Sequence, residues 1–592
     1  MKIRNYRLIN KKITNHRKKD KYVFDVLLYE INNIKDLKVD TKNIKVFRSA
    51  RHKNDMPTIF TLGKFDEAMQ DAITKISESG TSLIHDNSNL IVSDHLTIIG
   101  KSNQALVITF LGGKKHLIRT EIKVDQHGKF ISLKVYAEIN KLLKPHETFT
   151  TEDVEIYHTD NVNEAIKDFA KKKIKGIAVK KKKVPSIYCT WYYYGQTITY
   201  RDCLTNLKII KKKKLPIDTF QIDDGWEASV GSWYANEKFD EMAKVSKKIR
   251  EFGLTPGLWT APFVLDKESN IAKARPNWIL KDTDGKPCIF LVNKKEHYII
   301  DITIKETWTY LEKLYRKLTK MNGFVYHKLD FTRAPITAIN PNYKNKYITI
   351  IEAYRNACLS IRKGMGDSFF LMCGGLYDPV IGIVDGQRSG SDVLSMWDAP
   401  NRGGKTLPYT IKQNVLRYYM NEWWYNDPDA FIIRRNKKAH KGLKLSLGLL
   451  NDEEVKTSTI NQLLGGGLFS MTEPLDKIDD DRLNNLYHLL PLKKVNIDMK
   501  DIMATPRFPN EIRINQQYLA LINYDNKVLK KVITSKDILE NANNKTYSLV
   551  DFYTNKVAKN KINIRLLPHS ATIIKLTTEK IKHINNKGHY LC

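Results

Sequence analysis

The sequence predicts a multidomain α/β and β protein: an N-terminal β-sandwich, a central (β/α)8 TIM barrel and a C-terminal antiparallel β-sandwich. Three observations lead to this fold class. Before residue 165, apolar and polar residues alternate with the period of half-buried strands. From Pro185 onward the pattern is strand, loop and helix in repetition. After about residue 497 the helical spacing fades and short strand patterns return. A chain of 592 residues is also too long for one hydrophobic core.

Residues 1–165 are expected to form the N-terminal β-sandwich domain. Apolar residues alternate with charged ones through 118–124, and the alternation resumes at Ile131, Leu133 and Val135 after the turn signal at His127 and Gly128. Two such runs around a glycine turn predict a hairpin with one buried face. Residues 166–184 are then predicted to be a helical, Lys-rich linker, with its lysines solvated rather than forming an anion-binding patch.

Residues 185–497 are predicted to form the barrel. Helical spacing occurs between the strand patterns, as in Phe239, Met242, Val245, Ile249 and Phe252. In a barrel of this kind the catalytic groups lie at the C-terminal ends of the strands. The candidate strands are 186–193, 218–224, 255–263, 324–331, 369–375, 383–389, 424–432 and 466–472.

Residues 498–580 are predicted to form the C-terminal β-sandwich, and the polar residues 581–592 to form a tail. The strand patterns here are short and lack helical spacing between them. They cover residues 518–522, 547–553, 562–567 and 572–576.

The composition excludes several classes of function. The net charge is +33, from 98 Lys and Arg against 65 Asp and Glu, but the excess is spread along the chain without a recognisable nucleic-acid module. We therefore predict a solvated basic surface and no nucleic-acid partner; a basic binding protein on a degenerate barrel is the remote alternative. It would bind DNA in a salt-sensitive way and show no turnover.

Cysteine usage and hydropathy predict the compartment. The 6 cysteines lie far apart and form no CxxC pair, which argues against a zinc site or a disulfide framework and fits a reducing compartment. No apolar run reaches the length of a membrane span, and the basic N-terminus lacks the apolar core of a signal peptide. We expect a cytoplasmic protein with no membrane partner.

The fourth candidate strand ends on a carboxylate, Asp330, with Lys328 two residues earlier. Residues i and i+2 of a strand point to the same face, and a neighbouring cation keeps a carboxylate ionised. An ionised carboxylate at a strand's C-terminal end suits a nucleophile in a barrel enzyme. The alternative is a structural ion pair at a strand end.

Other strand ends carry groups that suit a sugar site. Asp223 and Asp224 follow the second strand, where they can accept hydrogen bonds from sugar hydroxyls, hold a metal ion or cap a turn; we favour the first interpretation. The remaining candidates are aromatic residues, which can stack on a ring, and a Cys-Gly pair that allows close approach of backbone to a ligand. They are Trp191, Trp259, Cys373 and Gly374.

Glycoside hydrolysis requires two carboxyl groups, and Asp330 and Asp392 form the natural pair. Asp392 follows a Ser-Gly-Ser loop, and in a closed site facing another carboxylate its pKa would rise, as a general acid requires. Arg388, four residues earlier, can anchor a hydroxyl or instead pair with Asp392 and oppose that rise. A loop-capping role for Asp392 is the alternative.

Several motifs together resemble the retaining α-galactosidases of glycoside hydrolase family 36, of the melibiase type. The motifs are Phe-Gln-Ile-Asp-Asp-Gly-Trp at 220–226, His-Lys-Leu-Asp at 327–330, Cys-Gly-Gly at 373–375, Val-Asp-Gly-Gln-Arg-Ser-Gly-Ser-Asp at 384–392, Trp-Tyr-Asn-Asp-Pro-Asp at 424–429, Gly-Gly-Gly at 465–467 and Leu-Pro-His-Ser at 567–570. The resemblance covers nearly the whole chain and implies the same three-domain fold.

The resemblance also implies residue roles. Asp330 would be the nucleophile and Asp392 the acid and base, so that configuration is retained. The other groups would bind a small α-galactoside such as melibiose or raffinose: Asp223 and Asp224 at O4 and O6, Lys328 and Arg388 at ring hydroxyls, Trp191 and Trp259 as walls. Neither a metal nor an organic cofactor is expected.

Two departures from the family pattern leave the specificity open. Leu-Tyr-Asp-Pro follows the Cys-Gly-Gly motif, where commoner members carry a longer glycine-rich run, and the third strand has Thr-Ala-Pro-Phe where those members have an acidic residue. The sister specificities are an α-N-acetylgalactosaminidase and a transglycosylase of the raffinose-synthase kind. Linkage preference and oligomeric state also stay open, with a homo-oligomer possible.

Overall fold

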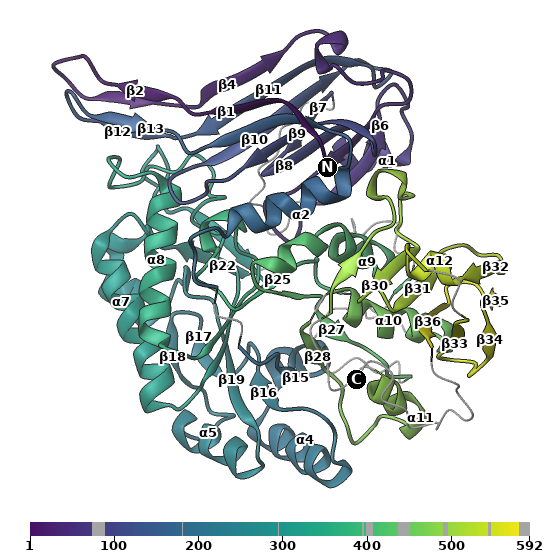
Figure 1. Ribbon diagram of the computed structural model, residues 1–592. Helices are drawn as coiled ribbons and strands as arrows, with labels where there is room; N and C mark the ends of the chain where they lie inside the picture. Colours follow the sequence, from purple (N-terminus) through teal and green to yellow (C-terminus); the bar gives the residue numbers. More distant parts are fainter. Residues whose placement is uncertain are drawn as a thin grey trace.

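The computed structural model describes residues 1–73, 89–179, 182–293, 295–393, 396–397, 406–435, 450–465, 467–488, 495–542 and 546–578. Figure 1 shows the N-terminal sheets above a barrel-like body, with the C-terminal sheets packed beside that body. The predicted tail, 581–592, and parts of the predicted linker (180–181) and of the predicted last barrel strand (466) lie outside the described residues. The boundaries between the domains stay predictions.

The N-terminal part contains two larger antiparallel sheets that share one apolar core, and two two-stranded ribbons, β2 (Lys12–Thr14) with β13 (Thr148–Thr150) and β3 (Lys21–Val23) with β12 (Lys141–Leu143). Ile108 and Ile156 of the first sheet pack in the same cluster as Ile122 and Val135 of the second. The first sheet has the order β1 (Ile3–Ile9), β14 (Val154–Thr159), β9 (Gln104–Phe110), β8 (Leu96–Lys101), β5 (Lys45–Arg48) and β6 (Thr58–Thr61). The second has the order β4 (Val26–Ile31), β11 (Phe130–Glu138), β10 (Leu117–Val124) and β7 (Leu90–Ser93).

The predicted hairpin is formed by β10 and β11, with Thr120 opposite Val135. The sequence predicts that Ile131 lies on the buried face of this hairpin, and this prediction is wrong, because Ile131 is 43% exposed. The register shifts between Lys123 and Val124, so that Val124 pairs with Phe130. The bulge changes which side chains of the strand face the core, because alternation restarts after the extra residue.

The helix α2 (Val162–Lys173) overlaps the predicted helical linker, and its apolar face is buried. Ile166 and Phe169 are fully buried in the large apolar cluster that also contains residues of the barrel. Figure 1 shows α2 lying between the N-terminal sheets and the body below them. Lys173 is also buried, contrary to prediction, because its ammonium contacts Asp378 at 2.6 Å.

The central sheet is parallel and has nine strands. Its order is β26 (Tyr425–Asp427), β25 (Gly386–Arg388), β24 (Phe369–Met372), β23 (Tyr326–Leu329), β19 (Thr255–Thr260), β16 (Thr219–Ile222), β15 (Ser186–Cys189), β28 (Phe469–Met471) and β27 (Ala430–Phe431). Only Pro428 and Asp429 separate the two edge strands β26 and β27 in the chain. The sheet therefore curls until its edges meet, as in a TIM-barrel-type fold.

Each predicted barrel strand coincides with an observed strand, and the predicted seventh strand is interrupted. Proline has no N–H to donate to a ladder, and Asp429 adopts a φ of 75°, so the two residues break the run 424–432 into β26 and β27. Both halves stay parallel to their neighbours: β26 pairs with β25, and β27 pairs with β28.

Helices follow most of the strands, as expected for a strand–helix repeat. The buried residues of α5 include the predicted Met242, Val245 and Ile249. Two small antiparallel sheets, not predicted, lie in the connections: β17 (Glu227–Ser229) with β18 (Ser232–Ala235), and β20 (Val264–Asp266), β22 (Lys295–Ile299) and β21 (Ile289–Val292). The helices are α3 (Trp191–Tyr194), α4 (Tyr200–Lys213), α5 (Met242–Glu251), α6 (Asn270–Ala274), α7 (Lys305–Arg316), α8 (Ile350–Met365), α9 (Leu407–Leu416), α10 (Asp452–Leu464) and α11 (Asp480–Leu483).

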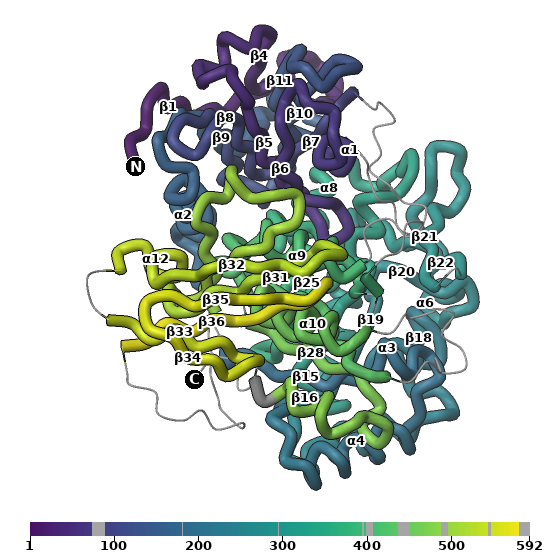
Figure 2. Tube along the Cα trace, turned by 90° about the vertical axis from the view of Figure 1, so that its right-hand side faces the viewer, coloured from purple at the N-terminus to yellow at the C-terminus, as the bar shows by residue number. Residues whose placement is uncertain are grey.

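The C-terminal part again has two antiparallel sheets with a shared core, in which Leu521 and Ile564 are buried. The larger sheet has the order β29 (Ile497–Asp498), β30 (Glu511–Ile514), β31 (Tyr518–Ile522), β36 (Ala571–Thr577), β33 (Ser548–Asp551) and β34 (Val557–Lys559); the smaller pairs β32 (Leu529–Thr534) with β35 (Lys561–Leu566). The other face of the larger sheet packs against the barrel helix α10, which Figure 2 shows beside β36.

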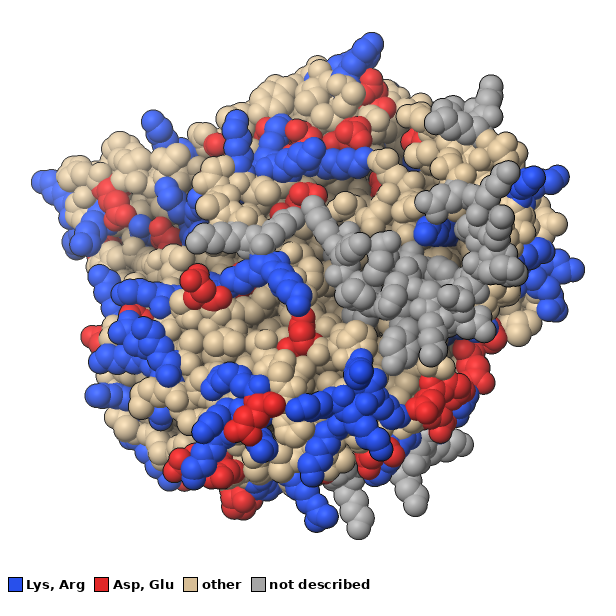
Figure 3. Space-filling view, turned by 60° about the horizontal axis from the view of Figure 1, so that its bottom comes forward, with Lys and Arg blue, Asp and Glu red and all other residues tan. Residues whose placement is uncertain are grey.

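The charged side chains on one face of the molecule agree with the prediction of a solvated basic surface. Figure 3 shows Lys and Arg scattered over the face that it presents, with Asp and Glu lying among them. Within the described residues, no helix combines the length and the apolar character that a membrane crossing requires.

Candidate functional site

The predicted site residues follow the C-terminal ends of neighbouring strands. Asp223 and Asp224 come after β16, Asp330 after β23, and Asp392 after β25. The ends of parallel strands lie at one edge of a sheet, which in barrel enzymes carries the active site. A direct contact joins two of these ends, because the ammonium of Lys328 lies 2.8 Å from Asp223 Oδ2.

Lys328 therefore pairs with Asp223, whereas the sequence had indicated Asp330 as its partner. Both side chains are almost fully buried. Burial alone would lower the pKa of Lys328, but the charge of Asp223 outweighs it and raises that pKa well above its ordinary value. The same carboxylate oxygen accepts a hydrogen bond from Gln221 Nε2 at 2.5 Å, and Cys189 Sγ donates to it at 3.3 Å.

Asp330 is held by its own backbone and by a tryptophan. The N–H of Phe331 donates to Asp330 Oδ1 at 2.7 Å, and Trp259 Nε1 donates to Oδ2 at 3.5 Å. Phe331 has a φ of 51°, a left-handed conformation that is strained for a bulky residue. Such strain persists only where the surrounding structure enforces it, and it is common at functional sites.

Gly374 makes room for this carboxylate. Its φ is +76°, and a Cβ at this position would lie 2.7 Å from Arg333 Nη1 and 3.2 Å from Asp330 Oδ1. The glycine was expected to let backbone approach a ligand. The structure shows that it lets the Arg333 and Asp330 side chains approach the loop.

Asp224 has one carboxylate oxygen that is bound and one that is not. Gln196 Nε2 and Asn293 Nδ2 both donate to Oδ2 at 2.9 Å. Oδ1 is buried and has no hydrogen-bond partner among the described residues. A buried acceptor without a donor is costly, so Oδ1 is suited to a ligand hydroxyl.

Glu227 is a member of the site that the sequence analysis missed. It is 7% exposed, and burial together with the neighbouring Asp224 raises its pKa well above the ordinary value. Glu227 lies beside Asp224, whose pKa burial also raises. The available signal was a third acidic residue directly after the Asp-Asp-Gly-Trp motif.

Two cations hold the same oxygen of Asp392. Lys53 Nζ lies 2.6 Å from Oδ1, and Arg388 Nη1 lies 3.2 Å from it. The Asp392 side chain is 38% exposed, whereas both cations are buried. The sequence left two roles open for Arg388, and the structure shows the pairing with Asp392. Its other guanidinium nitrogens contact Asp427 at 2.9 Å and Asp429 at 2.8 Å.

The two aspartates beside Pro428, where the predicted seventh strand is interrupted, anchor the loop that carries Asp392. Asp429 Oδ2 accepts the backbone N–H of Val393 at 2.7 Å and the hydroxyl of Tyr192. Burial raises the pKa of Asp429, which Arg388 partly offsets. The carboxylates on both sides of Pro428 thus fix Arg388 and the residue after Asp392.

Lys53 comes from the N-terminal sheets, and the sequence gave no sign of it. It lies in the connection between β5 and β6 and also donates to Cys373 Sγ at 3.4 Å. Burial raises the pKa of the Cys373 thiol to about 12, so the thiol is neutral. Cys373 and its neighbour Gly374 connect the surroundings of Asp392 with those of Asp330. That the two carboxyls face each other across one pocket, within about 10 Å, stays a prediction.

The two predicted aromatic walls differ in exposure. Trp259 is 2% exposed and accepts a hydrogen bond from Trp226 Nε1 through its carbonyl, at 2.9 Å. Trp191 is half-buried and packs against the cluster that contains Ile187 and Cys189. Their stacking role stays a prediction.

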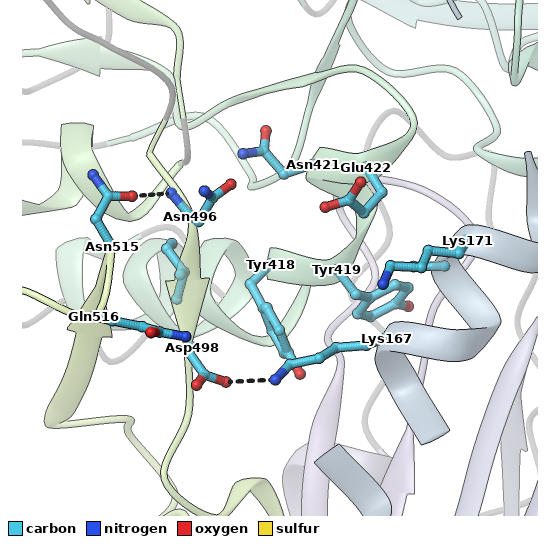
Figure 4. A pocket seen from close by; sticks show the side chains of 12 residues that line it. Lys167, Lys171, Tyr418, Tyr419, Asn421, Glu422, Asn496, Asp498, Asn515 and Gln516 are labelled. Carbon is cyan, nitrogen blue, oxygen red and sulfur yellow. Dashed lines mark hydrogen bonds and ion pairs between the residues drawn. The ribbon is translucent and has the colours of Figure 1, made fainter. Parts of the chain in front are cut away.

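Three described cavities lie away from this edge: one of about 430 Å³, lined by residues of β5, β6 and the segment 505–507, and the two that follow. One of about 610 Å³ is lined by Pro185, Thr219, Thr255, Tyr326 and Phe369, which lie at the starts of five strands and therefore at the opposite mouth of the barrel. The other, of about 480 Å³, lies where α2 and the segment 418–422 meet β29. Figure 4 shows its amide and tyrosine side chains; none of the predicted site residues lines it.

Comparisons with known proteins agree with the motifs. The melibiase family model matches residues 148–369. α-Galactosidase Mel36A of Lactobacillus acidophilus is 26% identical over 281 residues, which are 44% of this chain and 36% of that protein. α-Galactosidase AgaA of Geobacillus stearothermophilus is 22% identical over 240 residues, 36% of this chain and 30% of that protein. The matched stretches thus span about a third of these relatives.

Solved structures share the fold over a larger part of the chain. TtGalA, an α-galactosidase from Thermus thermophilus, superimposes with a TM-score of 0.63 at 20% identity, covering 86% of this chain and 95% of that one. The GH36 α-galactosidase AgaA superimposes with a TM-score of 0.63 at 13% identity, covering 96% and 79%. Together with the family-model match over residues 148–369 and the motifs at the strand ends, these likenesses support assignment of the chain to the melibiase-type glycoside hydrolase family 36.

Proposed function

We propose that the protein is a retaining exo-glycosidase that hydrolyses terminal α-D-galactosides of the melibiose and raffinose type. One observation carries the proposal: carboxylates follow three strands of a single parallel sheet, and two of them have surroundings that suit different roles. Asp330 accepts hydrogen bonds from two N–H donors, which fix the orientation of its carboxylate. Asp392 is partly open to solvent, where a leaving group must depart.

The chemistry proceeds by double displacement. An oxygen of Asp330 forms a bond to the anomeric carbon while the bond to the glycosidic oxygen breaks, and Asp392 donates its proton to that oxygen. The Asp392 carboxylate then takes a proton from water, whose oxygen attacks the anomeric carbon and displaces Asp330. Two inversions give net retention.

Recognition of the sugar falls to the buried polar groups beside the nucleophile. Asp224 Oδ1, a buried acceptor to which no N–H group of the described residues donates, supports binding of a hydroxyl such as O4 or O6. A site built around such an acceptor discriminates strongly against sugars that lack the hydroxyl, because the acceptor is then left unpaired. Asp223 is already engaged by Lys328, so it orients this group of residues and can accept from a second hydroxyl.

The substrates named for the solved relatives supply the test, since TtGalA is described in complex with stachyose and with p-nitrophenyl α-D-galactopyranoside. Purified protein should release p-nitrophenol from the α-galactoside and galactose from raffinose. Proton NMR of the first product should show the α-anomer, as retention requires. Release of the β-anomer would contradict the double displacement, and no turnover of any α-galactoside would contradict the proposed activity.

A further inference from the structure

Lys53 reaches the proposed acid from a different part of the chain. It lies 339 positions before Asp392, in the connection between two strands of the N-terminal sheets, and its Nζ is 2.6 Å from Asp392 Oδ1. Its side chain is only 3% exposed. Burying a lysine is costly unless its charge is paired, so a buried lysine aimed at a half-exposed aspartate requires an explanation.

The connection that carries Lys53 is clamped from both sides. Arg417, which follows α9, donates to the carbonyl oxygens of Lys53 at 3.3 Å and His52 at 2.9 Å. At its base, the Arg48 guanidinium pairs with Asp55 at 2.9 Å. Lys53 is thus held in place through its own backbone, independently of Asp392, and this kind of support preorganises a side chain for chemistry.

Charged and titratable groups from several elements lie around Asp392 and Lys53. Among the described residues, Arg388 of β25 contacts Asp392, Tyr192 of α3 and Asp429 between β26 and β27 interact with it electrostatically, and Cys373 and Tyr377 after β24 lie near Lys53. Burial raises the pKa of Cys373 and of Tyr377 to about 12 and that of Tyr192 well above its ordinary value, so these three are neutral. The cations in contact with Asp392 are Lys53 and Arg388.

A cation beside a carboxyl group stabilises the ionised form and so lowers the pKa of the group. The group is then a stronger acid, but it loses its proton at a lower pH. Arg388 is shared among three carboxylates, and Lys53 is the nearer of the two cations to Asp392 Oδ1, at 2.6 Å against 3.2 Å.

We propose that Lys53 is a positioning residue for Asp392: it holds one carboxylate oxygen and sets the pH above which Asp392 can no longer donate a proton. The inference rests on the proposed role of Asp392 as acid and base. During the first displacement the ion pair strengthens as the proton leaves Asp392 for the glycosidic oxygen. During the second, Asp392 takes a proton from water and the pair weakens again.

The test is the pH dependence of kcat/KM with raffinose, whose leaving group requires protonation. In wild-type protein the alkaline limb of this pH profile reports the pKa of the general acid in the free enzyme. Lys53→Gln should move this limb to higher pH by about one unit, because removing an opposite charge shifts a carboxyl pKa by roughly one to three units. Lys53→Arg, which keeps the charge, should leave the limb within about 0.3 units. An unmoved limb in folded Lys53→Gln would overturn the inference.

A second measurement separates this role from a structural one. In the Asp392→Asn background, Lys53→Gln should cause less than about a twofold further loss of kcat/KM, because residues acting through one another are not additive. A further loss of tenfold or more would overturn the inference. Lys53→Met is the second neutral variant, and failure of both neutral variants to fold would assign Lys53 a structural role and also overturn it.

The two proposals fail in different ways. Wild-type protein without activity on α-galactosides removes the proposed function, and this inference with it. An active wild type whose alkaline limb does not respond to Lys53→Gln removes only the inference.

Discussion

Lys173 of α2 contacts Asp378 of the barrel at 2.6 Å, and both side chains are almost fully buried. Burial would raise the pKa of Asp378, but Lys173 and His95 outweigh it and hold that pKa well below its ordinary value of 3.8. The pair joins the N-terminal sheets to the body that carries the site. The elements that place Lys53 and those that place Asp392 are thus connected at a second point, away from the site itself.

Lys173→Met should destabilise the protein by about 3–5 kcal/mol, because it leaves Asp378 buried without its main partner. Thermal unfolding followed by circular dichroism measures the loss. The matched control is Lys244→Met, which removes an exposed lysine paired with Asp240 and should change the melting temperature little. Equal effects in the two variants would contradict the importance of the buried pair.

The same pair predicts how stability depends on pH. Because the folded-state pKa of Asp378 lies below 3.8, its contribution is fully present above about pH 4 and is lost as the pH falls through the lowered value. Wild-type protein should lose stability in acid more steeply than Asp378→Asn, which no longer titrates there. Urea unfolding at a series of pH values between about 3 and 7 checks this, and parallel curves would contradict it.

Asp330→Ala should abolish turnover of p-nitrophenyl α-D-galactopyranoside, by at least about 10⁴-fold, while the melting temperature stays near that of the wild type. Without the carboxylate no covalent intermediate can form. Asp240→Ala, at an exposed position, is the matched control and should keep full activity. Retained activity in Asp330→Ala would remove the assignment of the nucleophile.

Asp392→Ala should affect substrates according to their leaving groups. Raffinose requires a proton early, so its kcat/KM should fall much further than that of the activated aryl glycoside. Azide, a small anion that needs no base to activate it, should restore turnover of the aryl substrate and give an α-galactosyl azide, because the second displacement retains configuration. Equal losses on both substrates would argue against the acid role of Asp392.

The sequence predicted the architecture well because its evidence is local. Strand alternation and helical spacing are properties of ten to twenty residues, and each predicted barrel strand coincides with an observed one. The interruption at Pro428 and Asp429 was missed, although a proline within a strand pattern is a known warning. Of the described lysines in the predicted linker, Lys173 was misjudged, because lysine-rich composition says nothing of the aspartate that lies opposite it.

Residues of the candidate site could be predicted only where they belong to a recognisable sequence motif. Lys328 shows the limit: its alternation with Asp330 was a valid reason to expect a pair, but a carboxylate of the next strand, Asp223, is the actual partner. Lys53 had no local signal at all, since it is one of 98 basic residues and meets the site only through the fold. The melibiase match ends at residue 369, before Arg388 and Asp392, so the acid also depends on motif and geometry.

Gly374→Ala should reduce activity by perturbing Asp330 without direct loss of a reacting group. An added Cβ would meet Arg333 Nη1 at 2.7 Å and Asp330 Oδ1 at 3.2 Å, so the carboxylate or the loop must shift. A displacement of about 1 Å at a reacting group costs on the order of 10²-fold in rate.

Gly285→Ala separates this steric effect from backbone strain. Gly285 has a φ of +81°, close to the +76° of Gly374, but a Cβ there would meet nothing within 4 Å. Both variants should lose about 1–2 kcal/mol of stability from the left-handed conformation, whereas only Gly374→Ala should lose kcat. Thermal unfolding and kcat with the aryl galactoside measure the two effects. If Gly285→Ala lost as much activity as Gly374→Ala, strain alone would explain the loss, and Gly374 would have no particular role beside Asp330.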